Sequence, residues 1–185
     1  SIAKRDSFFW RILLIFCCCL ISVSAFAQND LTITPTVIPP YSPNLDVWMS
    51  NPSRVLITVI NTSAKSYDIR LRGSAKNNDG SLSMETKDDA AVPVIHINPH
   101  ESKQLNLNDF RVFDPNVVRF KGTNTTIIAR THLLPDGVYQ LCVQALEYRS
   151  HTPLSPEQCT SFQITNADAP ILLAPSNKAE LDPQK

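Results

Sequence analysis

The chain has 185 residues, 43% of them hydrophobic, and its 17 lysines and arginines balance its 17 aspartates and glutamates. This length accommodates one domain and a remainder. The balanced charge argues against a nucleic-acid-binding protein, which would need a basic face.

The first 27 residues have the three parts of a secretory signal peptide. The basic start consists of Lys4, Arg5 and Arg11, and the apolar run covers residues 12–26. The run ends in Ala25-Phe26-Ala27, a small-residue cleavage site. An apolar core of about fifteen residues is too short to span a membrane comfortably. We expect cleavage near Ala27. The mature chain would begin at Gln28 with 14 lysines and arginines against 16 acidic residues, a net charge of about −2, and no membrane span.

Two other interpretations of this segment remain open. A bacterial lipoprotein would carry its lipid on a cysteine at the cleavage point, but Cys17, Cys18 and Cys19 lie inside the apolar run. An uncleaved anchor is the second alternative, and the Ala-Phe-Ala exit argues against it. The signal peptide predicts an exported protein, either secreted or associated with the outer membrane at the cell surface.

Strand-like runs follow, separated by prolines and polar turns. They cover residues 32–38, 54–61, 67–72, 81–85, 92–97, 101–107, 125–131, 138–146 and 161–165. Residues 54–61 are apolar on both faces, as in a central strand. Residues 67–72 alternate between apolar and charged side chains, which indicates a half-buried antiparallel strand. Asp79-Gly80 marks a tight hairpin, and Pro93 makes its run an edge strand.

The one candidate for a short helical turn is residues 108–118, capped by Asn108 and ended by Pro115. About eight short strands at roughly ten-residue spacing predict an all-β fold, an antiparallel immunoglobulin/fibronectin-like β-sandwich over residues 28–166. Residues 167–185 read as a linker and the start of a second, incomplete fibronectin-like module, or alternatively as a frayed tail.

The segment from Leu133 to Ala145 carries the strongest local signal. Its Pro135-Asp136-Gly137 turn leads into an alternating strand in which Tyr139 shares a face with Leu141. This pattern resembles the tyrosine corner of immunoglobulin-like and fibronectin type III domains, with Leu133, Gly137 and Tyr139 in the matching positions. We therefore expect the ring of Tyr139 inside and its hydroxyl bonded to upstream backbone.

Two cysteines belong to the mature chain, Cys142 and Cys159. In an oxidising compartment an isolated pair predicts one disulfide, worth about 3 kcal/mol in the chain-entropy model, although two free thiols are the alternative. Cys142 is an odd number of residues from Tyr139, so it points away from the core. We expect a peripheral disulfide that ties this strand to the next.

The order of these features resembles a known family. The signal peptide, L-T-I-T-P-T-V-I-P-P-Y, the strand L-P-D-G-V-Y-Q-L-C-V-Q-A, the second cysteine in C-T-S-F-Q-I and the closing P-I-L-L-A-P-S-N-K-A-E-L resemble the N-terminal region of TANFOR-type proteins. These are large exported proteins of Bacteroidota whose first domain precedes fibronectin-like modules. The resemblance implies a surface or secreted location and a modular architecture, and implies no particular activity.

Residues with catalytic or metal-binding chemistry form no persuasive pattern. The chain has no G-x-S-x-G motif, and its four glycines form no phosphate loop. His96 and His100 have the spacing of a zinc pair on a helix, but Pro99 disfavours a helix there. Asp88 and Asp89 lack the further oxygen ligands that calcium needs. We expect no catalytic site, no cofactor and no metal.

Trp48 and Tyr41 lie in a proline-interrupted segment and are possible ligand contacts, with the alternative that Trp48 closes one end of the sandwich. The sequence thus favours a binding or structural module that contacts protein partners at the cell surface or in a larger assembly. A carbohydrate-binding accessory module, which would use Trp48, is the second hypothesis. An enzyme is the third.

Overall fold

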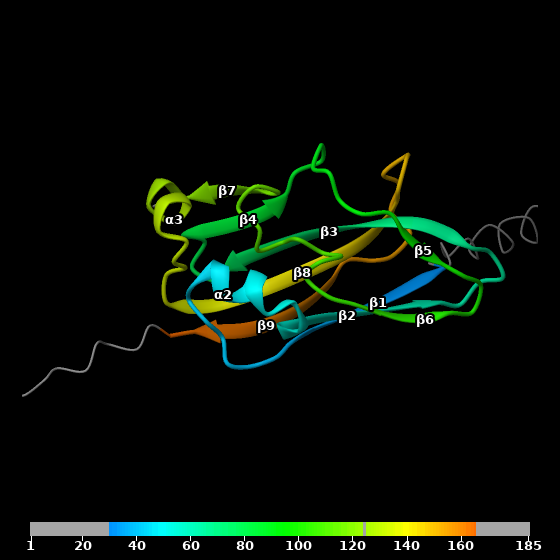
Figure 1. Cartoon of the computed structure of the whole chain (residues 1–185), viewed down its shortest axis with the longest axis horizontal. Helices are drawn as coiled ribbons and strands as arrows, with labels where there is room; N and C mark the ends of the chain where they lie inside the picture. Colours follow the sequence, from blue (N-terminus) through cyan, green and yellow to red (C-terminus); the bar gives the residue numbers. More distant parts are fainter. Residues whose placement is uncertain (1–29, 124, 166–185) are drawn as a thin grey trace, which may run out of the picture.

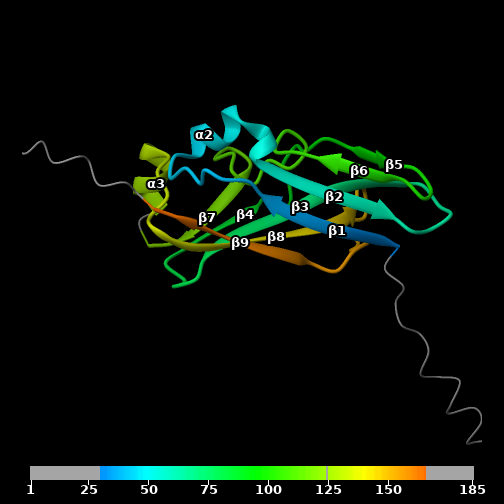
Figure 2. The same cartoon turned by 90° about the horizontal axis from the view of Figure 1, so that it is seen from below.

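Two antiparallel sheets packed against each other form the body of the molecule (Figures 1 and 2). The computed structural model describes residues 30–123 and 125–165. Within these residues the predicted antiparallel all-β sandwich is confirmed. The predicted signal peptide (1–27) and the predicted second module (167–185) lie outside the described residues.

The smaller sheet has three strands in the order β1-β2-β6. Their bounds are β1 (Leu31–Val37), β2 (Val55–Asn61) and β6 (Ser102–Leu105). Successive side chains of a strand point to opposite faces, so Leu31 and Ile33 enter the core while Thr32 and Thr34 stay exposed. β2 is the central strand, but it buries only one face, because Ile60 on the other is 38% exposed.

The larger sheet has the strand order β7-β4-β3-β8-β9, and β5 also pairs with β3. The bounds in chain order are β3 (Tyr67–Asn77), β4 (Leu82–Thr86), β5 (Ile95–Ile97), β7 (Val118–Gly122), β8 (Gly137–Glu147) and β9 (Gln158–Ile164). β3 and β4 are joined by the predicted turn, where Gly80 has a φ of +74°. Pro93 precedes β5, so only the last three residues of that predicted run form a strand.

Aromatic rings fill one part of the space between the sheets. Trp48 stacks on Phe113 with centroids 4.9 Å apart, and Tyr139 stacks on Phe162 at 5.7 Å. Phe110 lies directly against Gly73 in β3, where an added Cβ would overlap its ring. Glycine at this position therefore lets the connection between β6 and β7 pack closely on the sheet.

Three short helical segments interrupt the strands: α2 (Leu45–Ser50), the 3₁₀ turn η1 (Pro52–Arg54) and α3 (Thr125–Thr131). α2 and α3 lie toward the same end of the sandwich in both views (Figures 1 and 2). Among residues 30–123 and 125–165, no helix has the length and apolar character needed to cross a membrane.

Two sequence predictions about local structure are wrong. Residues 125–131, predicted as a strand, form α3, whose one buried residue is Ile128. β-Branched residues disfavour a helix only slightly, so this contact with the core outweighs propensity. Residues 108–118, predicted as a helical turn, form a series of turns instead, ending in β7. Phe110 and Val112 are both buried there, and residues two apart cannot share one face of a helix.

Candidate functional site

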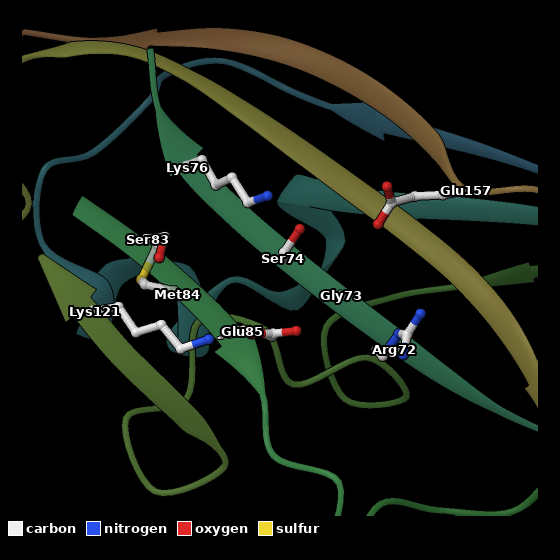
Figure 3. Close-up of a pocket in the computed structure, with 9 residues that line it drawn as sticks. All are labelled: Arg72, Gly73, Ser74, Lys76, Ser83, Met84, Glu85, Lys121 and Glu157. Atoms are coloured by element: carbon white, nitrogen blue, oxygen red, sulfur yellow. Dashed lines mark hydrogen bonds and ion pairs between the residues drawn. The ribbon is translucent and has the colours of Figure 1, made fainter. Parts of the chain in front are cut away.

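A polar hollow of about 290 Å³ lies on the outer face of the larger sheet (Figure 3). Three of its walls are β3, β4 and β7, and the connection between β8 and β9 supplies the fourth. The side chains that give it its chemistry are Arg72, Ser74, Lys76, Ser83, Glu85, Lys121 and Glu157. We call this site the basic hollow.

Strand alternation explains why these polar side chains gather on one face. Leu71 and Ala75 of β3 are buried in the core, so Arg72, Ser74 and Lys76 point outward. The register then places neighbours across the strands: Lys76 lies opposite Ser83, which in turn lies opposite Lys121. Three strands that are distant in sequence thus contribute to one site.

The charges in the basic hollow are unequal. Arg72, Lys76 and Lys121 carry three positive charges, against two carboxylates at Glu85 and Glu157. The Lys121 ammonium lies 3.0 Å from the Glu85 carboxylate, and Figure 3 shows the two pointing toward each other. The pKa of Glu85 is lowered, first by this hydrogen bond from Lys121. Burial, the next largest effect, opposes this shift, and the charges of Lys121, Arg72 and Lys76 lower the pKa further.

The remaining two cations of the hollow differ in their partners. Arg72 donates from Nη2 to Oε1 of Gln144 at 2.6 Å. The side chain of Lys76 is exposed, and its ammonium makes no hydrogen bond or ion pair with any described residue. Arg119, which lies opposite Glu85 on β7, adds a further exposed cation beside the hollow. The site can therefore accept an anion without first losing an internal partner of Lys76.

The disulfide borders the basic hollow. Cys142 and Cys159 are bonded, lie directly opposite each other on β8 and β9, and are 17 residues apart in sequence. Cys159 is exposed and Cys142 is 6% exposed, so the bond lies on the outer face, as predicted. Glu157 has a carboxylate oxygen within 4.8 Å of both sulfurs. Because the sulfurs are bonded to each other, they offer no thiolate ligands to a metal.

Tyr139 occupies the inner face of β8. Its ring is fully buried, and its hydroxyl donates to the carbonyl of Pro135 at 3.0 Å. Burial raises the pKa of Tyr139 to about 12. Gly137 begins β8 at a φ of +150°, with the side chain of Asn77 against the position of its missing Cβ. Leu133, however, is 46% exposed, and its neighbour Leu134 is the one that enters the core.

Trp48 lies inside the sandwich, the alternative expected for it, and this excludes a ligand contact at that residue. Trp48 is 1% exposed, and its indole nitrogen donates to the carbonyl of Ser42 at 2.7 Å. Tyr41 is half-buried and packs against Phe162. Since Trp48 lies in the core, it cannot stack on a sugar, and the carbohydrate-binding hypothesis loses the residue on which it depended.

The histidine and aspartate pairs noted in the sequence do not combine into a site. His96 bonds through Nδ1 to Asp68 at 2.7 Å on the outer face, while His100 lies in a turn with a φ of +55°. Asp88 and Asp89 are exposed in a turn. Among the described residues, the metal-ligating side chains that lie close together are Cys142, Glu157 and Cys159. None of these histidines and aspartates belongs to that group.

Sequence reasoning did not find the basic hollow. The signal available was the cations on alternate positions, Arg70, Arg72 and Lys76 in one run and Arg119 and Lys121 in another. The second run was not recognised as a strand. Even if both strands had been predicted, only their register with β4 shows that their cations lie close together.

Comparison with models of known protein families gave no match, and comparison with curated proteins gave none either. The function of this chain is therefore inferred below from its residues and its geometry.

Proposed function

We propose that this chain is a non-catalytic, exported β-sandwich module of a multidomain cell-surface or secreted protein. In this role it contacts protein partners and serves adhesion or assembly at the cell surface. The signal-peptide pattern of residues 1–27 and the resemblance to TANFOR-type proteins support export and modularity.

The observation that carries the proposal is the Cys142–Cys159 disulfide on the outer face. Disulfides persist in exported proteins and are rare in the cytosol, where thiols are kept reduced. A bond between two neighbouring strands, outside the core, suits a domain whose surface must hold its shape in an oxidising environment.

The polar outer face of the larger sheet favours contact over catalysis. It is extended, and it carries cations and neutral polar groups along β3, β4 and β7, whose side chains line the hollow (Figure 3). The opposite outer face, on the smaller sheet, presents mainly threonines along β1. We therefore place the partner on the larger sheet.

Photo-crosslinking in intact cells tests this function. The full chain, with residues 1–27 in place, would be produced in a Bacteroidota bacterium with a photoreactive residue at Gln140 on the outer face of β8, or at Thr34 on the outer face of β1 as the matched control. We expect discrete protein adducts outside the cytoplasm from position 140 and few from position 34. If neither position gave adducts while the chain was present outside the cytoplasm, the contact function would be contradicted.

A further inference from the structure

We propose that the basic hollow binds carboxylates of an acidic, extended segment of a partner protein. This inference rests on the function proposed above, because it names the kind of partner that the outer face of the larger sheet would contact. The hollow is lined by β3, β4, β7 and Glu157 as described.

The first step of the argument is charge. The mature chain would have a net charge of about −2, with 14 lysines and arginines against 16 acidic residues, yet the outer face of β3 and β7 gathers cations. The cations available on this outer face are Lys76, Arg119 and Lys121, which are exposed, and Arg72, which is half-buried. Arg70 shares the face but is 7% exposed and bonds to His151. Between these strands, β4 offers the single carboxylate of Glu85. A face of this sign attracts an acidic partner and discourages a basic one.

The second step is spacing. Arg72 and Lys76 are four residues apart on one face of β3, so their Cα atoms are separated by about 13 Å, with Ser74 midway. An extended peptide has the same rise per residue, so its side chains at i and i+4 match this interval. Acidic residues on alternate positions of an extended segment would therefore meet Arg72 and Lys76 together.

The third step is the nature of the anion. Glu85 and Glu157 reduce the excess in the hollow to one positive charge, which suits singly charged carboxylates better than doubly charged phosphates. The fork of Arg72 matches the plane of a carboxylate. No aromatic side chain is among the residues lining the hollow, so the stacking that usually anchors a sugar ring is missing. These features favour an acidic peptide over an acidic glycan.

The test measures binding of a fluorescent peptide of about four Glu-Thr repeats to the oxidised chain that begins at Gln28. A Lys-Thr peptide of equal length and an oligogalacturonate serve as the other two probes. Anisotropy titrations at low and at physiological salt give the dissociation constants. We expect the Glu-Thr peptide to bind, with affinity falling as salt rises, and the other two to bind at least about tenfold more weakly.

The double variant Arg72→Gln, Lys76→Gln removes two of the three cations and should weaken Glu-Thr binding by about tenfold. The matched control is Lys65→Gln, Arg149→Gln, which changes the net charge equally at exposed turns and should leave binding within about twofold. Because Arg72 also bonds to Gln144, the single variant Lys76→Gln, which breaks no hydrogen bond, is measured in parallel. It should weaken binding about threefold.

Three results would overturn the inference: no binding of the Glu-Thr peptide, equal losses in the double variant and its control, or binding of the oligogalacturonate in place of the peptide. The last would reassign the hollow to acidic glycans. Crosslinking from position 140 would still report whether the face contacts proteins, so failure of this inference and failure of the contact function are separable.

Discussion

Tyr139 combines a buried ring with a hydroxyl bonded to the carbonyl of Pro135, four residues upstream. The turn before it contributes to this geometry, because Gly137 adopts a φ of +150° that other residues rarely adopt. The residue thus joins the turn, the strand and the aromatic cluster. Its titration offers a direct probe of that environment.

Replacing Tyr139 by phenylalanine should reduce the free energy of unfolding by about 1 kcal/mol at neutral pH, because the Pro135 carbonyl loses its donor. The wild-type protein should also lose stability in alkali. Its phenol has a pKa of about 12 when folded and near 10 when unfolded, so its contribution is complete below pH 10 and is lost as pH rises toward 12.

Between about pH 9 and pH 11.5 this difference amounts to about 2 kcal/mol, and Tyr139→Phe should lack it. Urea unfolding of both proteins across that interval measures the effect, and the other titrating groups cancel in the comparison. Equal alkaline losses in the two proteins would show that Tyr139 is not buried as a neutral phenol.

At the scale of the element, α2 contributes Leu45 and Trp48 to the core, and Trp48 is the larger of the two. Trp48 lies 4.9 Å from Phe113 and 5.6 Å from Phe162, centroid to centroid. Asn44 caps the helix by accepting from the backbone N–H of Asp46, which fixes where the helix begins. A helix of six residues has little stability alone, so its two buried residues, Leu45 and Trp48, hold it in place.

Trp48→Ala should therefore cost about 3–5 kcal/mol of unfolding free energy, measured by urea denaturation. Val47→Ala is the matched control on the same helix, since Val47 is 39% exposed and its loss should change stability by less than about 0.5 kcal/mol. A folded Trp48→Ala protein of wild-type stability would place Trp48 at the surface, where the carbohydrate hypothesis needs it.

The disulfide links two neighbouring strands, β8 and β9. Opening the bond, by reductant or in the double variant Cys142→Ala, Cys159→Ala, should lower the free energy of unfolding by about 3 kcal/mol for a 17-residue separation. The reduced protein should keep its fold, because the bond lies outside the core. Reductant should not affect the alanine variant. Equal melting temperatures of the wild-type protein with and without reductant would rule out this stabilising role.

The sequence predicts an element when one face of it is buried and its pattern is local. The alternation in β1, β3 and β8 shows their inward residues directly, and even the outward position of Cys142 follows from counting to Tyr139. Residues 125–131 fail this rule, because one contact at Ile128 decides their structure. The basic hollow could not be predicted from the sequence, because its side chains come together only through the register of β3, β4 and β7.

For the whole molecule, the arrangement of the sheets separates two roles. The space between them holds the aromatic cluster and the hydroxyl of Tyr139. The outer face of the larger sheet holds the disulfide, the cations and the hollow. The exported module that we propose would need both, because a stable interior allows the exposed face to specialise in contact.

Peptide mapping without reduction tests both the export and the external disulfide proposed for this chain. The chain would be recovered from outside the cytoplasm of the producing cells and digested. We predict an N-terminal peptide that begins at Gln28 and one linked pair of peptides that contains Cys142 and Cys159. Peptides covering residues 12–26, together with free thiols at Cys142 and Cys159, would contradict the account.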